Sequence, residues 1–145
     1  MKALLDACVL YPTVLREILI GTAQAGLYTP LWSARILEEW ARAAARLSRG
    51  DEAVARGAIA ALQAGFPRAS VAPQPGLESR LHLPDANDIH VLAAAVAGGA
   101  DLIVTQNAAD FPRGVLAGEG LERRDADGFL WALWSEDPAA VAAVV

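Results

Sequence analysis

Short apolar runs alternate along the chain with longer segments whose apolar residues recur every three or four positions. The runs at residues 2–6 (KALLD), 69–73 (ASVAP) and 100–107 (ADLIVTQN) are typical of buried strands. Between them, helical periodicity with capping residues and Gly or Pro stops predicts four helices, which we expect at residues 13–24, 33–46, 51–66 and 88–97. Because strands alternate with helices, the pattern predicts an α/β fold with a central parallel sheet of four to five strands and helices on both faces.

Local chemistry suggests several element boundaries. The first strand is expected to continue through ACVL to a stop at Tyr11–Pro12, and the LYTP segment after the first helix is a short strand or connector. Gly50–Asp51 is expected to separate the second helix from the third. Residues 73–87 hold three prolines and no periodicity, which predicts an ordered loop. A helical tail is expected over about 125–145, preceded by a loop that holds a helical turn and an edge strand.

The helix at 33–46 carries one apolar stripe, and Ser33 is placed as its N-cap. The residues of the stripe are Ile36, Leu37, Trp40, Ala44 and Leu47. Glu39 lies on the flank of this stripe, whereas its neighbour Glu38 lies farther from it. Of these two adjacent glutamates, Glu39 is therefore the one expected to face neighbouring elements.

Length and composition limit the class of protein. The chain of 145 residues suits one domain with a real core, so we expect a single domain over residues 1–145. No apolar run reaches the ~20 residues of a membrane span, and no signal-peptide cleavage site follows the start, so a cytoplasmic protein is expected. The lone Cys8 is expected to be a small core residue. With one cysteine and two histidines, any metal should be a hard ion such as Mg²⁺ or Mn²⁺, held by carboxylates.

Three carboxylates far apart in the sequence are expected to meet at one edge of the sheet. Asp6 ends the first strand, Asp88 begins the last of the four helices, and Asp110 follows the next strand. In open α/β sheets, ligands bind beyond the carboxyl ends of the strands. Like charges gathered there are costly unless a cation neutralises them. The residues alone thus predict a divalent-metal site, and they leave phosphoryl transfer, haloacid-type hydrolysis and simple cation binding open.

Four segments of the chain resemble PIN-domain proteins in their order and spacing. They are LLDACVL at 4–10, LWSARILEEWARAAAR at 31–46, LPDANDIHVLAAAVAGGADLIVTQNAADFP at 83–112 and DADGFLWAL at 125–133. The third segment resembles most specifically the toxin-component branch related to VapC ribonucleases. The resemblance implies a PIN-like domain with Mg²⁺- or Mn²⁺-dependent ribonuclease activity, acting as the toxin of a type II toxin–antitoxin pair. It also implies an RNA substrate, an antitoxin protein as partner and a homodimer, without a membrane or an organic cofactor.

The same resemblance assigns roles to individual residues. The metal ligands and catalytic residues are expected to be Asp6, Glu39, Asp88 and Asp110. Three further residues are expected beside these ligands: Asp85, Thr105 and Asn107. Asp85 would cap the helix, and Thr105 would orient a carboxylate by a hydrogen bond. Asn107 stands where many relatives carry an acid, and this neutral amide lowers the charge available to a second metal.

Other interpretations of the same residues remain open. The net charge of −5 argues against a broad basic face, but Arg35, Arg42 and Arg46 could approach a phosphate backbone. His90 is expected at the surface or beside the ligands, because metal-activated water needs no separate base. The alternatives are a catalytically weak or inactive PIN scaffold that binds protein or RNA, and another divalent-metal phosphohydrolase. A haloacid-type enzyme would need a second acid two residues after Asp6, where the chain has Cys8.

Overall fold

Five short strands form one parallel sheet in the computed structural model, which describes residues 1–145. The strands, in chain order, are β1 (Lys2–Leu5), β2 (Thr29–Ser33), β3 (Ser70–Val71), β4 (Leu102–Val104) and β5 (Glu122–Arg124). Their order across the sheet is β3-β2-β1-β4-β5, and every neighbouring pair is parallel. The expected central parallel sheet is therefore confirmed.

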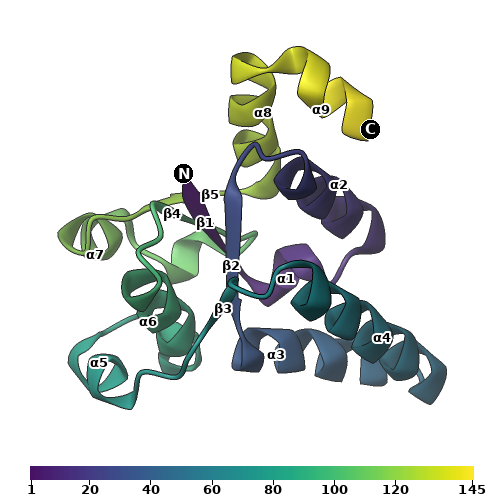
Figure 1. Cartoon of the computed structure of the whole chain (residues 1–145). Coiled ribbons are helices and arrows are strands. Elements are labelled where there is room, and N and C mark those ends of the chain that lie inside the picture. Colours follow the sequence, from purple (N-terminus) through teal and green to yellow (C-terminus); the bar gives the residue numbers. More distant parts are fainter.

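Helices cover both faces of this sheet. They are α1 (Ala7–Leu10), α2 (Thr13–Gln24), α3 (Ala34–Ala45), α4 (Arg49–Gly65), α5 (Pro75–Arg80), α6 (Ile89–Ala97), α7 (Arg113–Gly118), α8 (Ala126–Glu136) and α9 (Pro138–Val144), with single 3-10 turns η1 (Ala86–Asp88) and η2 (Ala108–Asp110). Figure 1 shows α5, α6 and α7 on one side of the sheet and α2 and α4 on the other. The predicted α/β fold is confirmed, and none of the helices is long and apolar enough to cross a bilayer.

The order of the strands creates a switch point beside β1. The chain runs from β1 to β2 and β3 on one side, and then returns to add β4 and β5 on the other side. Leu5 of β1 pairs with Val104 of β4, so the next residues, Asp6 and Thr105, leave the sheet side by side. Loops that diverge in this way open a crevice at the carboxyl edge of a parallel sheet.

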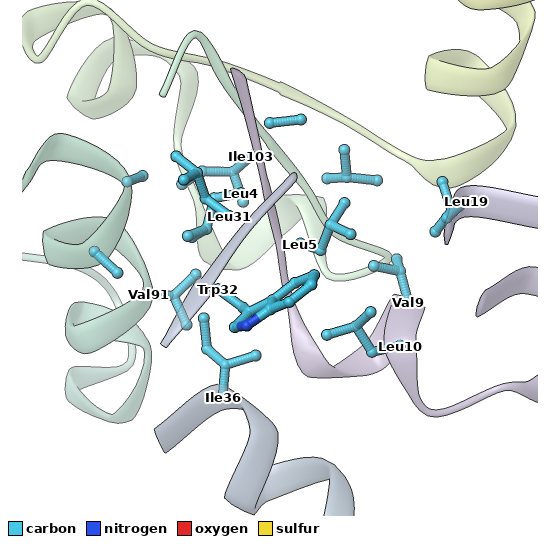
Figure 2. Close-up of a cluster of buried hydrophobic side chains, with 14 of the residues drawn as sticks. Leu4, Leu5, Val9, Leu10, Leu19, Leu31, Trp32, Ile36, Val91 and Ile103 are labelled. Carbon is cyan, nitrogen blue, oxygen red and sulfur yellow. The ribbon is translucent and has the colours of Figure 1, made fainter. Parts of the chain in front are cut away.

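The core locks these central strands between the two helical layers. Leu4, Leu5, Trp32 and Ile103 are fully buried, and Figure 2 shows them between Val91 of α6 and the side chains of the opposite layer. Truncating a buried leucine of this kind to alanine typically costs about 2–5 kcal/mol. The strand ends are therefore a rigid base for the loops that follow them.

The end of α6 needs two glycines to return the chain into β4. A Cβ atom at Gly98 would lie 2.9 Å from the side chain of Val71 and 3.0 Å from that of Leu31, so the close approach excludes a side chain. Gly99 has a φ of +68°, the left-handed conformation that glycine adopts without strain. The Gly98–Gly99 stop predicted from the sequence is confirmed.

The expected extension of the first strand through ACVL was wrong. β1 ends at Leu5, and Ala7–Leu10 form a helical turn instead. Asp6 has an extended backbone, and its Oδ1 accepts a 2.8 Å hydrogen bond from the amide of Ala7. An aspartate that caps the next turn ends a strand more effectively than apolar neighbours extend it. Asp6 therefore lies at the junction of β1 and α1.

Three further boundaries differ from the prediction. The helix α4 begins at Arg49 with Ser48 as its cap, so Gly50–Asp51 lies in its first turn and does not separate helices. Leu47 lies beyond the end of α3 and is exposed, so it does not belong to the apolar stripe. The expected loop at 73–87 contains α5 and the first two residues of η1. Proline at the first helical position permits α5, because its missing N–H has no partner to lose there.

Candidate metal centre

Asp6 occupies the centre of the crevice and is held by three neighbours. It is only 6% exposed, and its Oδ2 accepts a 2.9 Å hydrogen bond from the hydroxyl of Thr105. The Cys8 thiol lies 3.6 Å from the same oxygen. Burial raises the pKa of Asp6, whereas the hydrogen bonds from Thr105, Ala7 and Cys8 lower it. The carboxylate is thus fixed in orientation and costly to keep charged without a counter-ion.

Asp88 lies opposite, at the junction of η1 and α6. Its side chain caps neither turn, and its Oδ2 is buried without a hydrogen-bond partner. Asp85 instead caps η1 by accepting a 2.9 Å hydrogen bond from the amide of Asn87. The pKa of Asp88 is raised to about 6, mainly by burial and then by the nearby charges of Asp110, Asp85, Asp6 and Glu39, in that order. A buried oxygen left without a partner among several acids is suited to bind a cation.

Glu38 and Glu39 have different surroundings although they are adjacent on α3. Glu38 forms ion pairs with Arg56 at 2.9 Å and Arg42 at 3.2 Å, and these hydrogen bonds lower its pKa to about 2. Glu39 instead contacts His90 of α6 through Oε1, and its charge contributes to the raised pKa of Asp6 and of Asp88. Of the two, Glu39 is therefore the glutamate directed toward the other acids.

These side chains line a cleft of about 700 Å³ at the switch point. The sequence-predicted site residues that line it are Asp6, Arg35, Glu39, Arg42, Arg46, Asp88 and Asn107. The other three lie behind or beside the wall: Thr105 is fully buried against Asp6, Asp85 caps η1, and Asp110 is close enough to Asp88 to raise its pKa. The structure thus brings together the four acids that the sequence separates by up to 104 positions, from Asp6 to Asp110.

Several residues of the cleft wall were not expected from the sequence. Cys8, Tyr11, Trp40 and Asn87 all line the cleft. Cys8 packs against the core as expected, but its sulfur also accepts a 3.3 Å hydrogen bond from the amide of Gln106 and lies 3.5 Å from the Thr105 hydroxyl. Burial and the charge of Asp6 raise the pKa of this thiol. Its position two residues after Asp6 was the available signal.

The three arginines on α3 and at its C-cap differ in whether they form ion pairs. Arg42 is paired with Glu38, and Arg35 lies 3.9 Å from Glu78. Arg46 lines the cleft, is exposed and forms no ion pair. Of the three, Arg46 has its full donor capacity available to an anion in the cleft.

The chemistry of these donors fits a hard divalent cation. All four acids offer oxygen, and the buried Asp88 oxygen has no partner within the protein. No three His, Cys, Asp or Glu side chains lie close enough to hold one ion jointly. Mg²⁺ in proteins is usually held by only one or two carboxylates and keeps several waters, so a tighter cluster is not required.

The fold and the cleft define an α/β protein with a candidate divalent-metal site at the switch point of its sheet. A family model described as the PIN domain matches residues 2–109, and the chain belongs to this family. The match includes Asp6, Glu39 and Asp88 and ends one residue before Asp110. PIN domains are generally nucleases and usually use divalent metals. No curated protein and no solved structure showed significant similarity to the chain.

Proposed function

We propose that this PIN-domain protein is a Mg²⁺- or Mn²⁺-dependent ribonuclease. The observation that carries the proposal is Asp88: its buried Oδ2 has no partner, and the surrounding acids help to raise its pKa to about 6. Such an arrangement stores unfavourable electrostatic energy in the absence of a cation. A nuclease fold with this acidic cleft at its switch point supports phosphodiester hydrolysis.

Each residue of the cleft has a role in this proposal. Asp6, Glu39, Asp88 and Asp110 would supply the ligands, one or two of them directly and the others through waters on the ion. The hydrogen bond from Thr105 keeps the Asp6 carboxylate in one orientation. When bound, the divalent ion supplies a water of lowered pKa and stabilises the charge that develops on the phosphate.

The chain also offers groups for placing an RNA strand. Arg46, the C-cap of α3, lines the cleft and forms no ion pair. Arg35 and Arg42 of α3 line the same cleft, but each has an acidic neighbour. They would position the phosphate backbone across the acids, which raises the rate by orienting the reacting bond. Tyr11 in the same wall offers an aromatic face.

The biological role extends this proposal. The resemblance of residues 83–112 to VapC-related proteins supports a toxin of a type II toxin–antitoxin pair, with an antitoxin partner and a homodimer. Co-purification of a small protein encoded by a neighbouring gene tests the antitoxin, and light scattering of the purified chain tests the dimer. A monomer that retains no neighbour-encoded protein would contradict both parts.

RNA cleavage under controlled metal supply tests the enzyme. Purified protein is incubated with single-stranded RNA in EDTA, Mg²⁺ or Mn²⁺, beside D6N and D88N and the surface control D127N. We expect cleavage only with metal, its loss in D6N and D88N, and its retention in D127N. Cleavage that survives EDTA or either site variant would overturn the proposal. Hydrolysis of a phosphomonoester without RNA cleavage would favour the other phosphohydrolase, and RNA binding without cleavage would favour an inactive scaffold.

A further inference from the structure

His90 is the only polar side chain in α6. The helix reads IHVLAAAVA, and His90 itself is 7% exposed. It is thus buried among apolar neighbours rather than at the surface. A leucine at this position would avoid the cost of taking an imidazole out of water. Packing alone therefore does not explain a histidine at this buried position.

The ring of His90 contacts the carboxylate of Glu39. Nε2 of His90 touches Oε1 of Glu39 as an ion-pair contact, and neither ring nitrogen has a hydrogen-bond partner of good geometry in the protein. An imidazole nitrogen that carries a proton is a hydrogen-bond donor, and this carboxylate oxygen is the acceptor that lies against it. The contact joins α6, which begins at Asp88, to α3, which carries Glu39.

The two partners differ in exposure, and this difference indicates which one is being held. The His90 side chain is 5% exposed and locked by its surroundings, whereas that of Glu39 is 42% exposed at the cleft. A glutamate on an exposed helix face loses side-chain entropy when it adopts one conformation. Contact with the rigid, buried ring restricts Oε1 and leaves Oε2 of this cleft-lining residue available to another ligand.

We infer that His90 is a positioning residue that holds Glu39 in the orientation needed to bind the metal ion. The inference rests on the proposed metal-dependent function and adds a residue to its machinery. Groups that hydrogen-bond to metal ligands orient them, and losing one typically lowers metal affinity about 10–100-fold. His90 acts here through Glu39 and does not itself bind the ion.

Isosteric substitutions separate this role from packing. In H90Q the amide nitrogen replaces Nε2, in H90N it replaces Nδ1, and H90L fills the space without a donor. Mn²⁺ affinity is measured by electron paramagnetic resonance, with thermal unfolding as the check on folding and H82Q, at an exposed loop histidine, as the matched control. We expect H90Q and H82Q to bind like the wild type, and H90N and H90L to bind about tenfold more weakly.

A double-mutant cycle shows whether His90 works through Glu39. In the E39Q background, H90L should cause no further loss of Mn²⁺ affinity, because the orientation it controls no longer concerns a charged ligand. Additive losses in the double variant, or wild-type affinity in a folded H90L, would overturn the inference while leaving the metal site intact. Absence of Mn²⁺ binding by the wild-type chain would instead overturn the proposed function, and the inference with it.

Discussion

The hydroxyl of Thr105 donates a 2.9 Å hydrogen bond to Oδ2 of Asp6 across a separation of 99 residues. Each residue lies one position beyond the paired ends of β1 and β4, where Leu5 is opposite Val104. Thr105 also accepts a 3.1 Å hydrogen bond from the amide of Asn107. One buried hydroxyl thus links the central acid to the loop that carries the fourth acid.

Removing this hydroxyl should weaken both the site and the fold. We expect T105V to raise the pKa of Asp6 further, because the Thr105 hydrogen bond is the largest effect that lowers it. It also removes the stronger of two hydrogen bonds to the buried Oδ2 of Asp6, where the Cys8 thiol remains, at a cost of about 1–3 kcal/mol. Mn²⁺ titration at several pH values should show weaker binding, with its onset moved to higher pH, and thermal unfolding should show a lower Tm.

The conservative variant T105S provides the control for this prediction. It retains the hydroxyl and loses only a methyl group, so the pH dependence of Mn²⁺ binding should match that of the wild type. If T105V binds Mn²⁺ with an unchanged pH profile, the hydroxyl does not tune Asp6.

The metal-free protein should lose stability as pH rises toward neutrality. The pKa of Asp88 is about 6 in the folded state and 3.8 as its ordinary value. Folding therefore favours the neutral form of Asp88. The resulting contribution to the free energy of unfolding is fully present below pH 3.8 and is lost as the pH rises through about 6. The raised pKa of Asp6 acts in the same direction. Thermal unfolding in EDTA between pH 4.5 and 7.5 should show the fall, on the order of 2–4 °C for each kcal/mol.

The variant D88N isolates this contribution. Because its amide does not ionise, the fall in Tm between these pH values should be smaller than in the wild type, and Tm at pH 7.5 should be higher. The acids Glu38 and Glu119 have lowered pKa values, so their effects lie at more acidic pH, and D127N should behave like the wild type. If the Tm values of D88N and the wild type fell in parallel with pH, Asp88 would not be the source of the pH dependence.

Substituting Asn107 with aspartate should strengthen metal binding. Asn107 lines the cleft near the other acids, and its neutral side chain makes no capping hydrogen bond. N107D adds one negative charge, so Mn²⁺ affinity or stoichiometry measured by calorimetry should increase, and the metal-free Tm at pH 7.5 should decrease. The isosteric exchange keeps the volume of the side chain. A higher Tm without a change in Mn²⁺ binding would show that no metal site lies beside Asn107.

Arg46 should contribute to RNA binding more than its neighbours do. It lines the cleft and is free of ion pairs, whereas Arg42 and Arg35 have acidic neighbours. We expect R46A to raise the Kd for single-stranded RNA and to reduce the dependence of log K on log salt by about 0.7, the value for one phosphate contact on a single strand. The exposed Arg68 lies outside the cleft, so R68A should leave both quantities unchanged. An equal effect of R46A and R68A would indicate non-specific attraction only.

Sequence periodicity predicted the helices and strands well where packing and local preference agree. The helix at 13–24, the Ser33 cap and the Gly98–Gly99 stop are examples. Prediction failed where a side chain competes with the apolar pattern. Asp6 ends β1 by capping the next turn, and Ser48 rather than Gly50 marks the start of α4. Such side-chain hydrogen bonds are local, but periodicity does not register them.

The sequence by itself determined that three aspartates follow or precede strands of a parallel sheet, since strand direction places those ends on one edge. It also placed Glu39, not Glu38, on the flank of the apolar stripe. Only the tertiary structure decided how these groups interact. Asp85 caps η1, so Asp88 makes no capping hydrogen bond, and Glu39 of α3 lies against a buried histidine of α6. Burial, orientation and charge coupling depend on neighbours distant in sequence, and spacing along the chain does not encode them.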